Sequence, residues 1–118
     1  MKPHLHSRAS VRKFGGQVAD YQKIHDFIDS SKAHVADMRH RAILHSSFGI
    51  YIVEQVFGIL LVNSDKKEVS TRDVAEEHIL EDLGRIPSVQ DYLENMTLET
   101  WMGGPSVRIR KIESLLVD

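Results

Sequence analysis

The chain contains no cysteine among its 118 residues. Disulfide bonds, thiolate zinc sites and cysteine nucleophiles are therefore excluded. An apolar run typical of a secretory signal is missing after the first residues, and the longest uncharged stretch, residues 42–53, is too short to cross a bilayer. No GxSxG sequence nominates a serine nucleophile, and the Gly15-Gly16 and Gly103-Gly104 pairs lack the lysine and spacing of phosphate loops. We therefore expect a cytoplasmic protein that uses none of these chemistries.

Charge is distributed unevenly along the chain. The formal net charge of −2 argues against general nucleic-acid binding. Residues 1–45 carry eight basic and four acidic groups, or +4, together with six of the seven histidines. Residues 46–118 carry seven basic and thirteen acidic groups, or −6. Such a chain can bind an anionic small molecule or nucleotide at one end, or pair end to end as a homo-oligomer.

Apolar periodicity and capping signals predict a mainly α fold, a single compact helical domain with one small β-hairpin. Short apolar or β-branched runs at 59–62 and 68–70 flank a turn and predict the hairpin. The expected helices are residues 3–14, 21–30, 34–58, 71–83 and 89–96. We assign residues 1–104 to the domain. We expect residues 105–118, which have apolar residues at helical spacing, to be a C-terminal tail that packs on the domain or on a partner chain.

The longest predicted helix, residues 34–58, is expected to lie at the centre of the domain. Its first half is rich in ionisable residues, and its second half is apolar nearly all round, as in a helix surrounded by protein. On a helical wheel one stripe contains His34, Asp37, Met38, Arg41, His45, Phe48, Ile52 and Val56. We therefore expect its ionisable groups to point toward the interior or a cleft.

The segments RHRA, FG, EDLGRIPS and WMG occur in this order along the sequence. In these segments the sequence resembles a family of short bacterial and phage proteins of unknown function, and the similarity spans about residues 3–104. The matching positions are Pro3-His4, Gly15-Gly16, Tyr21, Ile24-His25, Asp29 to His34, Asp37, Arg39 to Ala42, His45, Gly49-Ile50, Glu54, Phe57-Gly58, Arg72, His78 to Pro87 and Trp101 to Gly103. The resemblance implies one intact domain with many shared polar positions, and it supplies no activity.

Histidines and carboxylates at helical spacing predict a divalent metal site. Imidazole and carboxylate are the usual ligands of zinc, iron or manganese when cysteine is absent. Two helices that each offer a histidine and a carboxylate can assemble such a site. The candidate ligands are His34, Asp37, His45 and His78 with Glu81 or Asp82. Arg41 belongs to the same stripe and would repel a cation unless it binds an anion.

A phosphate pocket is an alternative for the same region. Guanidinium groups bind phosphate oxygens bidentately, and neutral imidazoles can donate to them. The candidate residues are Lys32, Arg39, His40, Arg41 and Arg72. A third alternative is a buried hydrogen-bond and ion-pair network with a purely structural role. The dipeptide His25-Asp26 matches part of the motif of metal-dependent HD phosphohydrolases, but a dipeptide recurs by chance.

Three functions remain open from the sequence. The first is a metal-dependent hydrolase of a phosphorylated small molecule or nucleotide, with Glu54 or Glu81 as base. Glu54 has a structural alternative, since it can pair with Arg72 inside the apolar half of the central helix. The second function is an oligomer that senses or sequesters an anion or nucleotide without turnover. The third is a protein-interaction module or inhibitor of phage or bacterial origin.

Overall fold

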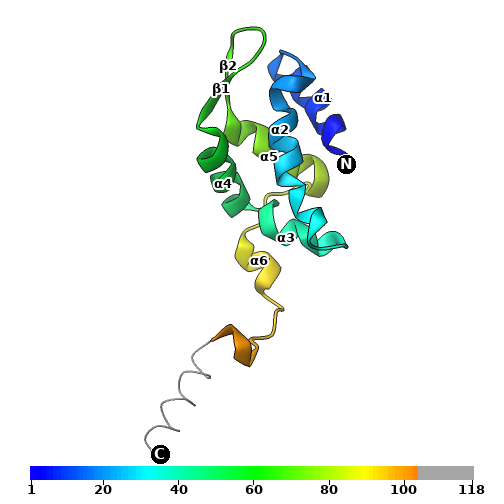
Figure 1. Ribbon diagram of the computed structural model, residues 1–118, viewed down its shortest axis with the longest axis vertical. Coiled ribbons are helices and arrows are strands. Elements are labelled where there is room, and N and C mark those ends of the chain that lie inside the picture. Colours follow the sequence, from blue (N-terminus) through cyan, green and yellow to red (C-terminus); the bar gives the residue numbers. More distant parts are fainter. Residues whose placement is uncertain (104–118) are drawn as a thin grey trace, which may run out of the picture.

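The computed structural model describes residues 1–103 (Figure 1). Helices dominate, with one antiparallel hairpin, so the predicted mainly α fold is confirmed. The elements in chain order are α1 (Pro3–Phe14), α2 (Val18–Ile28), the 3-10 turns η1 (Ser30–Ala33) and η2 (Met38–His40), α3 (Arg41–Leu44), α4 (Ser47–Phe57), β1 (Leu60–Val62), β2 (Glu68–Ser70), α5 (Thr71–Leu83), α6 (Val89–Leu93) and the 3-10 turn η3 (Thr100–Met102). The predicted tail, residues 105–118, lies outside the described residues.

Local capping sets the ends of α5. The Ser70 side chain accepts a hydrogen bond from the Asp73 backbone N–H, which otherwise has no partner in the first turn. Gly84 adopts a left-handed conformation with φ 72° and returns its N–H to the Leu80 carbonyl. Both signals were readable in the sequence, and the predicted bounds of this helix are confirmed.

The predicted long helix over residues 34–58 is wrong. The chain instead forms η2, the short α3 and then α4. His45 leaves the helical region with ψ 61°, and the extended Ser46 becomes an N-cap whose Oγ accepts from the Gly49 N–H at 3.1 Å. Asp37 caps η2 in the same way. These side chains satisfy the backbone locally and so compete with continuation of one helix.

The break also changes which apolar side chains are buried. Phe48 and Val56, expected to face the core, are 52% and 55% exposed, whereas Ile50 and Val53 of α4 are buried. The core joins α2, α4 and α5 with a residue each from α3 and β2, namely Tyr21, Ile24, Ile28, Leu44, Ile50, Val53, Val69, Val74, Ala75 and Ile79. Trp101, the one tryptophan of the chain, is 81% exposed. No helix within residues 1–103 has the length and apolar character needed to cross a membrane.

Gly49→Ala is expected to lower the free energy of unfolding by about 3 kcal/mol, the upper range for overpacking. A Cβ at this position would lie 1.7 Å from the Leu44 carbonyl oxygen, so the turn between α3 and α4 would have to move. Urea unfolding followed by circular dichroism measures the loss. Ser47→Ala, at an exposed position two residues away, is the control and is expected to change stability by less than about 0.5 kcal/mol. Equal stability of the two variants would contradict this account of the break.

Candidate metal centre

A polar layer lies beside the apolar core, where α1, α2 and α5 pack together (Figure 1) and His45 reaches them from the end of α3. Its ionisable side chains have at most 6% of their surface exposed. They are His6 of α1, His25 of α2, Asp29 at the end of α2, His45 at the end of α3, and His78 and Asp82 of α5. Four segments that are distant in sequence therefore place six ionisable groups in one enclosed region.

Helical spacing explains how α2 and α5 contribute to this layer. His78 and Asp82 stand at i and i+4 on α5, and His25 and Asp29 have the same spacing across the last turn of α2. Residues four apart lie on one face of a helix, so each helix presents a histidine and a carboxylate together. The two helices pack against each other and direct these faces inward. His45 enters from the segment where α3 ends.

Two histidines and two aspartates have the geometry of a metal-ligand set. His45 Nε2 lies 3.3 Å from Asp29 Oδ1 and 3.0 Å from Asp82 Oδ2. His78 Nε2 lies 3.2 Å and 3.4 Å from the same two oxygens. A tetrahedral site with metal–ligand bonds of about 2.0 Å has edges of about 3.3 Å between ligand atoms. One ligand atom from each residue lies within 4.8 Å of the others, so these groups could hold a metal ion.

The electrostatics of this set favour ionised carboxylates. Burial tends to raise the pKa of Asp29 and Asp82, but hydrogen bonds from His45 and His78 outweigh it, and both pKa values lie below their usual range. Burial tends to lower the pKa of His45, yet its contacts with the two carboxylates raise it. The set therefore contains two buried negative charges, which require positive charge close by.

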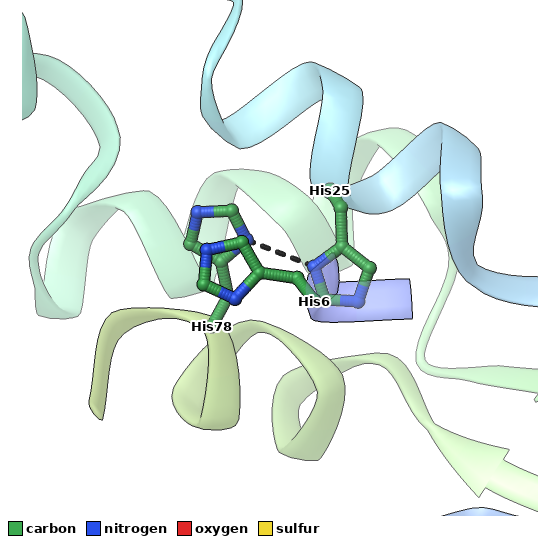
Figure 2. A group of neighbouring side chains, drawn as sticks. All are labelled: His6, His25 and His78. Carbon is green, nitrogen blue, oxygen red and sulfur yellow. Dashed lines mark hydrogen bonds between the residues drawn. The ribbon is translucent and has the colours of Figure 1, made fainter. Parts of the chain in front are cut away.

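His6, His25 and His78 form a second group of close imidazoles (Figure 2). The rings of His6 and His78 are stacked with centroids 3.7 Å apart. His25 Nδ1 lies 2.8 Å from His78 Nδ1, a hydrogen-bond distance that is short for the edge of a metal site. Ring nitrogens bind metals in the plane of the ring, and stacked parallel rings direct them side by side. This group is therefore better described as a support for His78 than as a second ligand set.

Burial keeps His25 neutral. Loss of solvent is the largest cause that lowers its pKa, to about 3, and the neighbouring His78 and His6 act in the same direction. A neutral imidazole has one donor and one acceptor nitrogen. His25 uses both of them, since its Nε2 lies 2.8 Å from Ser10 Oγ of α1. The buried face of α1 is polar, with His6, Ser7 and Ser10.

The structure brings together three of the predicted ligands and separates two. His45, His78 and Asp82 meet as expected. His34 is exposed after η1, and the Asp37 side chain is 53% exposed and bonded to Arg39, which lowers the Asp37 pKa to about 2. Assigning these two residues to the site required the continuous helix that the structure lacks, so that part of the prediction is corrected.

The predicted anion-binding residues do not form one pocket in the described structure. Arg39 pairs with Asp37, while Arg72 pairs with Glu54 and Glu76. Lys32 and Arg41 instead approach the metal-ligand set, with Lys32 Nζ 3.8 Å from Asp29 and an Arg41 nitrogen 4.0 Å from Asp82. His40 is buried, and its backbone carbonyl accepts a hydrogen bond from Ser31.

The predicted catalytic glutamates lie apart from the four ligand atoms. Glu54 forms the alternative pair with Arg72, at 3.5 Å. Glu81 Oε1 lies 3.4 Å from Nδ1 of His6, which is its one described partner. Neither carboxylate has a described contact with the four ligand residues.

Three residues of the polar layer, His6, His25 and Asp29, were missing from the predicted site. A usable signal was present, because the spacing His-x-x-x-Asp occurs at both 25–29 and 78–82. His6 had no comparable signal, since its burial depends on the packing of α1 against α2.

Comparison with known proteins identifies the family of the chain but gives no activity for it. We found no significant match to the chain among curated proteins or among solved structures. A family profile described as "Domain of unknown function (DUF6915)" matches residues 1–102, which include every residue of the polar layer. This match confirms the resemblance expected from the sequence to a family of unknown function. The chain belongs to the DUF6915 family.

Proposed function

We propose that the protein is a metal-binding domain that holds one divalent transition-metal ion, of the zinc class, with His45, His78, Asp29 and Asp82. The observation that carries the proposal is the set of four nitrogen–oxygen distances between 3.0 and 3.4 Å, which match the edges of a tetrahedral zinc site. Two nitrogen and two oxygen ligands also suit iron(II) or manganese(II). Metal analysis therefore has to decide which of these ions the protein binds.

Charge balance supports a divalent ion. Two ionised aspartates and two neutral imidazoles carry a charge of −2, which one divalent cation neutralises. Without a cation, the positive charge near the carboxylates comes from protonated histidine, from the N-terminal ammonium of Met1, 2.9 Å from Asp82 Oδ1, and from Lys32 and Arg41 at the edge of the site. Asp29 Oδ2 is buried without a hydrogen-bond partner, so this carboxylate oxygen lacks a stabilising hydrogen bond in the absence of a cation.

The enclosure supports a structural role for the ion. Catalytic zinc sites keep one coordination position open for water or substrate, whereas structural sites have four protein ligands. Here four protein atoms are available, and their side chains are at most 6% exposed. The ion would join α2, α3 and α5. Hydrolysis of a phosphorylated small molecule or nucleotide, anion or nucleotide sequestration, homo-oligomer formation and a protein-interaction role stay predictions that no described contact favours.

Metal analysis of the purified protein tests the proposal. After incubation with zinc and removal of free ion, we expect one zinc per chain in the wild type. His78→Ala and Asp82→Asn are expected to lose the ion, since each removes one of four ligands. His34→Ala and Asp37→Asn are the matched controls and are expected to keep full occupancy, because both side chains are exposed away from the set.

Two results would overturn the assignment. One is a wild-type protein that binds no zinc, iron or manganese in this experiment. The other is loss of the ion in His34→Ala with full retention in His78→Ala, which would return the site to the residues expected from a continuous central helix. Far-ultraviolet circular dichroism of each variant separates loss of a ligand from loss of the fold.

A further inference from the structure

A chain of hydrogen bonds runs from His78 to the backbone of α1. His78 Nδ1 lies 2.8 Å from His25 Nδ1, and His25 Nε2 lies 2.8 Å from Ser10 Oγ. Ser10 Oγ also lies 3.1 Å from the carbonyl oxygen of His6, one helical turn earlier. All of these residues are at most 2% exposed, and Figure 2 shows the link between His25 and His78. We call His78, His25 and Ser10 the relay.

With both imidazoles neutral, the relay has two consistent arrangements of protons, because every link joins groups that can either donate or accept. In the first arrangement His78 carries its proton on Nε2 and donates to Asp29 Oδ1, at 3.2 Å. His78 Nδ1 then accepts from His25 Nδ1–H, and His25 Nε2 accepts from the Ser10 hydroxyl. In the second arrangement every donor along the relay becomes an acceptor.

An ion at His78 Nε2 is compatible with the second arrangement alone. Metal binding needs the bare lone pair of Nε2, so the His78 proton must sit on Nδ1 and donate to His25 Nδ1. His25 then carries its proton on Nε2 and donates to Ser10 Oγ. The Ser10 hydroxyl turns to donate to the His6 carbonyl, an acceptor already within reach. No buried donor in the relay loses its partner.

We propose that His25 and Ser10 are positioning residues whose hydrogen bonds reverse direction when the ion binds, holding His78 in the tautomer that presents Nε2 to it. This inference rests on the proposed metal site. The proton count is balanced, because each imidazole carries one proton and Ser10 keeps its own in both arrangements. The proton lost from Nε2 of His78 is matched by the one gained at Nδ1, and His25 exchanges Nδ1–H for Nε2–H.

Ser7 shows that a buried serine on α1 does not by itself imply this role. Its hydroxyl donates to Gln22 Oε1 at 2.9 Å and is equally enclosed, but it has no described contact with the relay. Ser7 and Ser10 are thus two buried serines on the same helix, and one of them contacts a histidine of the polar layer. Ser7→Ala therefore serves as a matched control for Ser10→Ala.

The test uses the full chain with ¹⁵N-labelled histidine, measured without metal and after loading with zinc. The ¹⁵N shifts of a neutral imidazole distinguish the protonated from the bare nitrogen. We expect His25 to carry its proton on Nδ1 in the metal-free protein and on Nε2 after loading. In a zinc competition titration, Ser10→Ala is expected to weaken affinity roughly 10- to 100-fold, the range for outer-shell partners. Ser7→Ala is expected to leave affinity unchanged.

The outcomes separate the relay from the metal site itself. If zinc binds to the wild type and the His25 tautomer does not change, the relay is wrong and the metal site stands. Equal zinc affinities for Ser10→Ala and Ser7→Ala also contradict the relay. If zinc does not bind to the wild type at all, the proposed function fails and the relay fails with it. The tautomer measurement needs no variant, so a Ser10→Ala protein that does not fold leaves the test intact.

Discussion

Zinc at roughly a thousand times its dissociation constant is expected to raise the free energy of unfolding of the wild-type protein by about 4 kcal/mol. The ligands lie between positions 29 and 82, on α5 and at the ends of α2 and α3, so the unfolded chain does not present all four together. An ion that binds the folded state alone stabilises it by mass action. Urea unfolding of chelator-treated protein, with and without added zinc, measures the increment.

Asp82→Asn provides the comparison for this increment. The variant keeps the size of the side chain but removes a carboxylate that contacts both His45 and His78. Zinc is expected to raise its free energy of unfolding by less than about 0.5 kcal/mol, which is the size of the change that a neutral surface substitution causes. His4→Ala, at an exposed position on α1, is expected to gain as much from zinc as the wild type. Equal gains in Asp82→Asn and the wild type would place the ion elsewhere.

The metal-free protein is expected to lose stability as the pH falls below about 6.5, the ordinary pKa of histidine. Burial lowers the pKa of His25 to about 3, so between these values the unfolded chain binds a proton there that the folded chain does not. Stability therefore rises with pH in this window, by about 1.4 kcal/mol per unit from this one group. Burial also lowers the pKa of His40, which acts in the same direction.

His45 has the opposite dependence. Its pKa is raised in the folded state, so its contribution is complete below pH 6.5 and is lost as the pH rises through the raised value. The metal-free protein should thus be most stable near pH 6.5. His25→Gln is expected to flatten the acid side of this profile above pH 4. An equally steep acid side in His25→Gln, from urea unfolding at a series of pH values, would contradict a buried neutral His25.

The elements that sequence predicted well are those with short-range signals. The ends of α5 follow from Ser70 and Gly84, whose hydrogen bonds reach no further than one turn. The same kind of signal was available at Ser46, but the apolar run from Phe48 onward favoured a continuous helix. Whether Ser46 caps a helix or lies within one depends on where the flanking residues pack, which the local sequence does not specify.

The residues of the candidate site likewise fall into those with a short-range sequence signal and those placed by tertiary packing. His78 and Asp82 were predicted because their spacing places them on one face of a single helix. His6, His25 and Asp29 join them through the packing of α1 and α2 against α5, a tertiary arrangement that helical periodicity does not determine. His34 and Asp37 were included because a wheel drawn through a helix break gives false alignments. The recurring His-x-x-x-Asp spacing is the signal that would have nominated Asp29.

X-ray absorption at the zinc edge of the loaded wild-type protein tests the metal centre most directly. We expect four nitrogen or oxygen ligands at about 2.0–2.1 Å, with the outer-shell scattering of two imidazole rings. We expect His78→Ala to lose the scattering of one imidazole ring, or to lose the bound zinc and its absorption signal altogether. A six-coordinate spectrum dominated by water, or a spectrum without imidazole scattering, would contradict a site built from His45, His78, Asp29 and Asp82.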